Sequence, residues 1–226
     1  MTTRFTMTGT TVVGALLNFE SAWKAFEPSM HQPPHNKPPH YPVLHIKPAN
    51  TWSGDGDAIV LPPGVDEVEV GATLGIVIGR TASRVRVADA LGHVAGYVIV
   101  NDVTVPHASL LRPPIRQKCR DTFCPMGPHL VPAGRVADPD ALAIRIHVNG
   151  ALRLTETTAH LRRPVSKLIA DVTEYMSLHP GDVLLVGVPV GLPRARAGDR
   201  IAIEIDGLGR LENHVVLEEA FEGATA

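Results

Sequence analysis

The chain has 226 residues, of which 44% are hydrophobic and 19% charged, with 21 basic and 23 acidic residues. This length can bury a sizeable core in one large domain, and the nearly balanced charge argues against nucleic acid or a membrane surface as the main partner. No apolar run approaches the roughly 20 residues of a membrane-spanning helix, and the N-terminal residues are a poor signal or transit peptide, so we expect a cytoplasmic protein.

The first 50 residues are expected to form a small N-terminal segment ahead of a catalytic-type domain at 51–226. Within that segment, Thr10–Leu17 is predicted to be a strand, and a short amphipathic helix is predicted around Ser21–Phe26. The Pro- and His-rich stretch His31–Tyr41 excludes regular structure, because proline removes backbone donors and fixes φ. Residues 41–48 are then predicted to form a short buried strand.

The middle of the chain carries the most apolar run. Thr73–Gly79 is predicted to be a central strand that is buried on both faces. Ala88–His93 is expected to form a short helix, and Gly96–Val105 the next strand, which ends before a proline. The proline-interrupted, mixed-charge segment at 113–128 is expected to be irregular.

The C-terminal part has the clearest local patterns. Leu142–Val148 alternates between apolar and polar residues and leads into Asn149-Gly150, which predicts a hairpin with a type I′ turn. Apolar residues recur at helical spacing over Pro164–Leu178. Three further strands are expected at Val183–Val188, Arg200–Ile205 and Arg210–Val216. Many strands with few helices indicate an α+β fold.

Several motifs in order give the chain a family resemblance. They include GIVIGR at 75–80, GYVIVND at 96–102, KCRDTFCPMGP at 118–128 and GDRIAIEIDGLGRLEN at 198–213. In this order and spacing the chain resembles the fumarylacetoacetate hydrolase family, and more specifically the N-terminal half of isomerase/decarboxylases of 4-hydroxyphenylacetate breakdown. The resemblance implies a strand-rich mixed β-sandwich roll. It also implies a homodimer, or a heterodimer with a paralogous subunit.

The metal position of that family is altered in this chain. Members with a full site carry Glu-x-Glu on one strand and an Asp about 30 residues later, where this chain has Gly71, Thr73 and Asp102. Residues i and i+2 of a strand point the same way, so the Glu-x-Glu pair supplies two of the oxygen ligands that Mg²⁺ prefers. This chain lacks both glutamates, and Asp102 alone is a weak metal site. We expect no tightly bound cofactor, with Mg²⁺ or Mn²⁺ held only together with substrate or a companion subunit. The alternative role for Asp102 is to cap a turn.

Basic residues suggest how an acidic substrate is held. The resemblance places Lys118 near the substrate, and Arg112, Arg116 and Arg120 surround it in sequence. Arginine can hold a carboxylate through two hydrogen bonds, which suits a di- or tricarboxylate, although charged loops are mostly solvent-facing. Lys47 is a further candidate for substrate binding, with a solvent-exposed position beside a proline as the alternative.

Histidines supply the remaining candidates. His107 follows Asp102 by five residues and could move protons near neutral pH, against the alternative of an exposed loop histidine. Four histidines at irregular positions in the Pro-rich region, at 31, 35, 40 and 45, share no helix or strand face, so zinc is not expected. Cys119 and Cys124 are expected to be free, buried thiols.

The expected catalytic residues are therefore Lys118, Asp102 and His107. The resemblance implies an isomerase/decarboxylase subunit acting on carboxylated 2-oxo-ene acids, namely 5-oxopent-3-ene-1,2,5-tricarboxylate and 2-hydroxyhepta-2,4-dienedioate. Two alternatives stay open at this point. The first alternative is a catalytically degenerate partner of a metal-bearing paralogue. The second is an acylpyruvate-type hydrolase that cleaves C–C bonds.

Overall fold

Strands dominate the computed structural model of the protein, which describes residues 3–107 and 113–218. The strands are β1 (Thr3–Arg4), β2 (Val12–Leu16), β3 (Val43–Ile46), β4 (Trp52–Ser53), β5 (Ala58–Leu61), β6 (Glu67–Glu69), β7 (Ala72–Ile78), β8 (Val94–Asn101), β9 (Cys124–Pro132), β10 (Ala143–Val148), β11 (Ala151–Thr157), β12 (Val183–Leu185), β13 (Arg194–Arg196), β14 (Arg200–Ile205) and β15 (Gly209–Leu217). The helices are α1 (Glu20–Met30), α2 (Ile115–Lys118) and α3 (Val165–Thr173), with 3₁₀ turns η1 (Ala49–Thr51), η2 (Val87–His93), η3 (Ala133–Arg135) and η4 (Thr158–His160).

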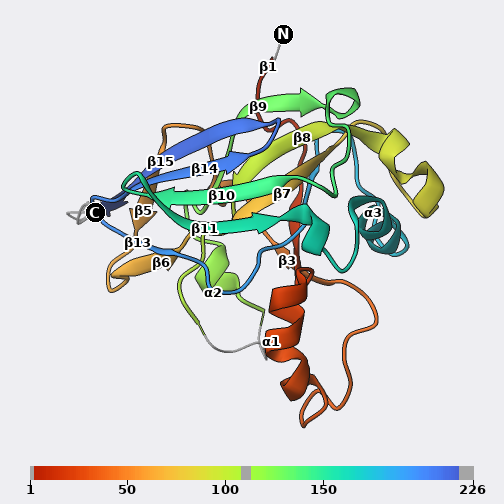
Figure 1. Ribbon diagram of the computed structural model, residues 1–226, viewed down its shortest axis with the longest axis horizontal. Helices are drawn as coiled ribbons and strands as arrows, with labels where there is room; N and C mark the ends of the chain where they lie inside the picture. The colour runs from red at the N-terminus through yellow and green to blue at the C-terminus, as the bar shows by residue number, and fades with distance from the viewer. Residues whose placement is uncertain (1–2, 108–112, 219–226) are drawn as a thin grey trace, which may run out of the picture.

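The strands assemble into two large sheets and one small one (Figure 1). An eight-stranded sheet runs β1-β9-β8-β7-β12-β2-β3, with β4 beside β9, and a five-stranded sheet runs β11-β10-β14-β15-β5. In the first sheet, β12 lies between β7 and β2, antiparallel to the former and parallel to the latter. The predicted α+β class is confirmed. None of the helices in the described ranges has the length and apolar content needed to cross a bilayer.

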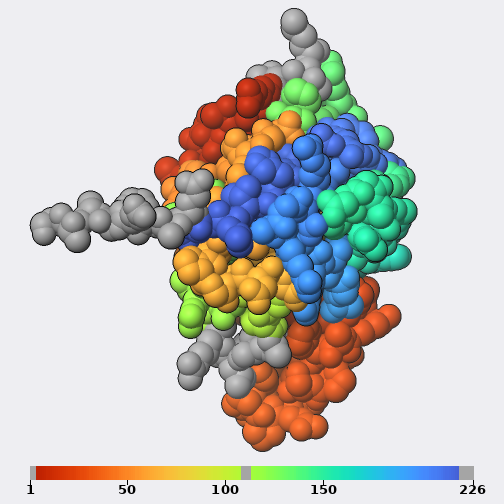
Figure 2. Space-filling view, turned by 90° about the vertical axis from the view of Figure 1, so that its left-hand side faces the viewer, coloured from red at the N-terminus to blue at the C-terminus, as the bar shows by residue number. Residues whose placement is uncertain are grey.

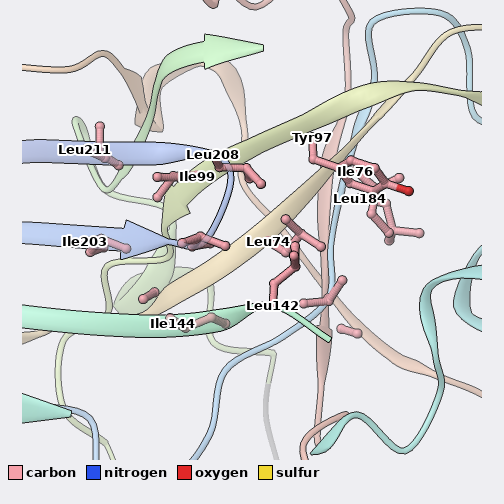
Figure 3. Packing of buried hydrophobic residues seen from close by; sticks show 14 of the residues in the cluster. Leu74, Ile76, Tyr97, Ile99, Leu142, Ile144, Leu184, Ile203, Leu208 and Leu211 are labelled. Carbon is pink, nitrogen blue, oxygen red and sulfur yellow. The ribbon is translucent and has the colours of Figure 1, made fainter. Parts of the chain in front are cut away.

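The main core fills the space between the two large sheets (Figure 3). β10 alternates buried and half-buried residues, so that Ile144 and Ile146 face inward while the polar residues between them face out. They belong to the same hydrophobic cluster as Leu74 and Ile76 of β7. β7 is buried along its whole length because a second apolar cluster covers its other face, as the sequence predicted for Thr73–Gly79.

The N-terminal part contributes both to the large sheet and to a protrusion. β2 and β3 are strands of the eight-stranded sheet, so backbone hydrogen bonds join the first 50 residues to the rest. A domain boundary at residue 50 remains a prediction. α1 is longer than the helix predicted at Ser21–Phe26, and the following loop has no regular structure before β3, as expected. Together they form a lobe at one end of the molecule (Figure 2).

The segment at 113–128 is more regular than the sequence suggested. It contains the short helix α2 and most of β9, which pairs along β8 and was not predicted. Its prolines at 125, 128 and 132 disguise the strand. They are tolerated because β4 and β1 cover only short parts of one edge of β9, which leaves few positions where a donor is required.

Two other expectations needed correction, and one turn was confirmed. α3 ends at Thr173 instead of Leu178, because Leu178 pairs with Ala82 in an isolated bridge that draws the chain away from the helix axis. β3 is only partly buried. The hairpin between β10 and β11 has positive φ at both Asn149 and Gly150, which is the predicted type I′ geometry.

Candidate active site

A buried carboxylate, that of Asp102, lies directly after β8 and is in contact with three basic side chains. Lys118 Nζ lies 2.7 Å from Oδ2, Lys47 Nζ lies 2.9 Å from Oδ1, and His45 Nε2 lies 3.1 Å from Oδ2. We call these four residues the Asp102 cluster. Their side chains are between 0% and 5% exposed, so the interactions occur in a low-dielectric interior.

Lys47 is the structural centre of this cluster. It follows β3, is completely buried, and donates hydrogen bonds to the carbonyl oxygens of Val103, Lys118 and Phe123 at 2.8–2.9 Å. Each of its three N–H groups therefore has a backbone carbonyl acceptor, and the positively charged nitrogen also forms an ion pair with the Asp102 carboxylate. The alternative of a solvent-exposed Lys47 is wrong, because its buried side chain joins Val103, Lys118 and Phe123. Substrate binding by Lys47 remains a prediction.

Lys118 has fewer partners than Lys47. It ends α2, and its Nζ donates to Asp102 Oδ2 and to Thr104 Oγ1, both at 2.7 Å. The Thr104 hydroxyl donates a hydrogen bond to the backbone carbonyl oxygen of Asp102 at 3.2 Å, which leaves Oγ1 free to accept a hydrogen bond from Lys118. Within the described ranges, the third N–H of the Lys118 ammonium group has no hydrogen-bond acceptor.

His45 packs against the backbone of the neighbouring strand β2. A Cβ on Gly14 would lie 2.3 Å from His45 Cε1, so only glycine leaves room for the ring. Burial lowers the pKa of His45, and the attraction of Asp102 offsets this only in part. His45 is therefore neutral near pH 7, and the other ring nitrogen, Nδ1, has no partner among the described residues.

The charges in the cluster do not cancel. Burial alone would raise the pKa of Asp102, but Lys118, Lys47 and His45 together hold that pKa well below its usual range. Asp102 is thus ionised and balances one ammonium group. Burial lowers the pKa of Lys118, with Asp102 opposing this and Lys47 adding to it. When both lysines are protonated, the cluster carries one positive charge in excess.

Lys118 also lies on the wall of a pocket of about 220 Å³. Its polar wall consists of Glu69, Thr104, His107 and Lys118. The rest is mainly apolar and comes from the end of β2, from α1 and from the loop before β13, with residues Leu16, Leu17, Ala22, Phe26, Pro114 and 188–192. Larger hollows occur elsewhere on the described part of the chain, and the largest of these, lined by residues such as His35 and Lys167, includes no residue of the Asp102 cluster.

The structure brings only some of the predicted site residues together. His107 is exposed on the pocket wall, with Nδ1 3.2 Å from the carbonyl oxygen of Val105. Arg116 is exposed and Arg120 donates from Nε to the Arg116 carbonyl, and neither lines the pocket. Arg112 lies outside the described residues. A substrate contact by any of the three arginines remains a prediction.

The residues at the family's metal position do not fit a divalent ion. A Cβ on Gly71 would lie 2.4 Å from the Asp102 carbonyl oxygen, so the backbone excludes any larger side chain there. Thr73 offers a buried hydroxyl without a partner, and both oxygens of Asp102 face ammonium groups. No group of three or more His, Cys, Asp or Glu within the described ranges could hold a metal. Nor does the Asp102 carboxylate accept a backbone N–H there, so it does not cap a turn.

Three residues of the site were missed by the sequence analysis. His45 was considered only as part of a histidine tract, whose other members at 31, 35 and 40 are exposed. Glu69 and Thr104 form an isolated β-bridge beside the pocket. Their spacing was the available signal, because each lies two residues from a position already singled out, Gly71 and Asp102 respectively.

Comparisons with known proteins agree with this fold. Residues 11–216 match the family model described as fumarylacetoacetate hydrolase C-terminal. The chain is 40% identical over 211 residues to the 4-hydroxyphenylacetate degradation bifunctional isomerase/decarboxylase of Salmonella dublin, covering 93% of this chain and 48% of that protein. The chain therefore spans about half the length of the curated relatives with this activity that it matches.

Solved structures support the same architecture. The 5-carboxymethyl-2-hydroxymuconate delta-isomerase of Mycobacterium smegmatis superimposes with a TM-score of 0.80 at 31% identity, covering 94% of this chain and 81% of that one. Maleylpyruvate hydrolase of Sphingobium sp. SYK-6, solved with manganese(II) and pyruvate, gives 0.78 at 30% identity, covering 93% and 72%. The predicted roll-type fold is confirmed.

Proposed function

The chain belongs to the fumarylacetoacetate hydrolase family, and on that premise we propose that it is an isomerase/decarboxylase or one subunit of such an enzyme. Its substrates would be the carboxylated 2-oxo-ene acids of 4-hydroxyphenylacetate breakdown. The tricarboxylate would lose CO₂, and the resulting 2-hydroxydienedioate would undergo a 1,3 proton shift. The same proposal places the protein in the cytoplasm.

One observation carries this proposal: the excess positive charge of the Asp102 cluster reaches a largely apolar pocket through Lys118. Loss of CO₂ next to a conjugated 2-oxo group leaves an electron pair that the 2-oxo end must take up. A cationic nitrogen at that end stabilises the developing charge, and it does so more strongly in a low-dielectric pocket than in water. Residues of this chain can supply that nitrogen where metal ligands are lacking.

The other residues divide between positioning and proton transfer. Asp102 does not line the pocket, so its role is to position Lys118. His107 and Glu69 are the titratable groups on the pocket wall besides Lys118. A 1,3 proton shift needs a group that removes a proton from one carbon and returns it to another, and we assign this role to His107, with Glu69 as the second group available.

A second candidate function is that of a non-catalytic partner. It is favoured by the replacement of two metal-binding glutamates by Gly71 and Thr73. In that case a paralogous subunit of the same fold would bind Mg²⁺ or Mn²⁺, and this chain would complete the assembly, in the way that the longer relatives span two such lengths. A homodimer is the corresponding arrangement for the first candidate.

The two candidates can be separated with the purified chain. We expect it to consume the ultraviolet-absorbing 2-oxo-ene dioate by itself, with the rate unchanged by a chelator. Lys118→Met should abolish this activity, while Lys24→Met, an exposed lysine on α1, should leave it unchanged. If turnover appears only after a companion subunit with intact Glu-x-Glu is added, the partner role is correct and the proposed activity of this chain is not.

A further inference from the structure

The two buried lysines around Asp102 are not equivalent. Lys47 directs its three N–H groups at three backbone carbonyls, so no position on its nitrogen is left for another partner. Lys118 has two oxygen partners, so one position on its nitrogen has no partner within the described residues, and Lys118 belongs to the pocket wall. One lysine is therefore fully engaged by backbone acceptors, and the other has a position on its nitrogen that is open to a further partner.

The charge balance points in the same direction. Lys47 and Asp102 neutralise one another at 2.9 Å, and His45 adds no charge. Lys118 contacts the same carboxylate at 2.7 Å and is 4% exposed, so two ammonium groups share one carboxylate and a proton on Lys118 leaves the buried cluster with one positive charge in excess. Desolvation and the neighbouring Lys47 favour loss of this proton, while Asp102 at 2.7 Å opposes it. The ammonium group that stabilises charge in the proposed function can therefore give up its proton, and the resulting amine beside a cation is the arrangement that makes a lysine nucleophilic.

The surroundings suit addition of that amine to a carbonyl. The pocket wall beside Lys118 is mainly apolar, which limits competing hydration of the nitrogen. Glu69 and His107 lie on the same wall and can carry protons to and from a reacting oxygen. Thr104 accepts a hydrogen bond from Lys118 and so directs the remaining lone pair of the nitrogen.

We propose that Lys118 forms a covalent imine with the oxo carbon of 2-oxo acids. This inference rests on the proposed function for its substrate class and specifies how the pocket takes up electrons. The neutral Nζ adds to the oxo carbon, the oxygen leaves as water with two protons, and C=N replaces C=O. Once protonated, the iminium accepts the electron pair released as CO₂ departs. A proton then adds to carbon, and water hydrolyses the C=N bond to restore the amine and the oxo group.

The test is reductive trapping. The intact chain is incubated with pyruvate, the smallest 2-oxo acid, and treated with sodium borohydride, and the product is analysed by intact mass and peptide mapping. We expect a mass increase of one carboxyethyl group per chain, located on Lys118. Lys118→Arg, which keeps a positive charge but cannot form an imine, should show no adduct. Lys47 and exposed Lys24 serve as internal controls and should remain unmodified in the parent protein.

Turnover of the 2-oxo-ene dioate is measured on the same samples, so that the two claims fail separately. An adduct without turnover supports the imine and removes the proposed function. Turnover without an adduct, or full turnover by Lys118→Arg, overturns the imine and leaves the proposed function in place. Absence of both contradicts both. An adduct spread equally over exposed lysines shows non-specific reduction and also overturns the inference.

Discussion

Replacing Lys47 with methionine should destabilise the fold far more than replacing Lys118 with methionine, although both lysines contact Asp102. The first change leaves Asp102 paired with Lys118 at 2.7 Å but leaves buried backbone acceptors without their donor, each of which costs about 1–3 kcal/mol. These acceptors are the carbonyls of Val103 and Lys118, and that of Phe123, which keeps only its bond from the Val103 amide. A combined loss of about 4 kcal/mol would be a large share of a typical folding free energy of about 5–15 kcal/mol.

Lys118→Met leaves Asp102 with Lys47 at 2.9 Å and places a side chain of similar shape in the same space. It also removes the charge that the cluster does not balance. Because Asp102 keeps one ammonium partner and no backbone carbonyl loses a donor, we expect a change of about 1 kcal/mol or less. Activity should nevertheless be lost, which separates the functional lysine from the structural one.

Urea unfolding followed by far-ultraviolet circular dichroism measures both free energies, with Lys24→Met as a control for losing an exposed lysine. The linear extrapolation requires equal m-values for the parent and the variants, which is checked in the same data. Equal losses for the two buried lysines, or a loss below about 1 kcal/mol for Lys47→Met, would refute the division of roles.

Three further changes probe other parts of the structure. Asp182→Ala leaves three backbone N–H groups without their carboxylate acceptor and should cost about 2–4 kcal/mol in urea unfolding; an unchanged midpoint would contradict this. Gly71→Ala places a Cβ 2.4 Å from the Asp102 carbonyl oxygen and should cost about 1–3 kcal/mol by thermal or urea unfolding; a stable variant would mean that the site has more room than described. Burial raises the pKa of the Cys124 thiol to about 12, so an aromatic disulfide reagent at pH 8 should modify Cys119 in the folded protein and Cys124 only after unfolding, whereas rapid reaction of both would rule out a buried Cys124.

Local sequence patterns were sufficient to predict the elements whose structure is not decided by residues distant in sequence. The hairpin at Asn149-Gly150 was predictable because its turn demands positive φ at two positions. β7 was predictable from its unbroken apolar run. β9 was not, because three prolines hide a strand whose pairing is decided by β8, far away in sequence. The early end of α3 likewise depends on a bridge to Ala82 that no local pattern reveals.

The candidate site shows a similar division. Lys118 and Asp102 were identified individually through a family resemblance, and His107 by its position in the sequence. Their meeting with Lys47 around one carboxylate depends on β3, β8 and α2 approaching in three dimensions, which no spacing predicts. The burial of Lys47 has the same origin, since a lysine beside a proline is usually solvated, which was the alternative to substrate binding, and only its three carbonyl partners hold it inside.

The place of β12 between β2 and β7 has a consequence for biosynthesis. The strand that completes the centre of the large sheet is made late, since Val183 pairs with Val12 on one side and Val77 on the other. A nascent chain still on the ribosome before that point presents two apolar strands with unpaired edges, which are templates for self-association. Chaperone dependence during translation should therefore end abruptly once Leu185, the last residue of β12, has left the ribosomal exit tunnel.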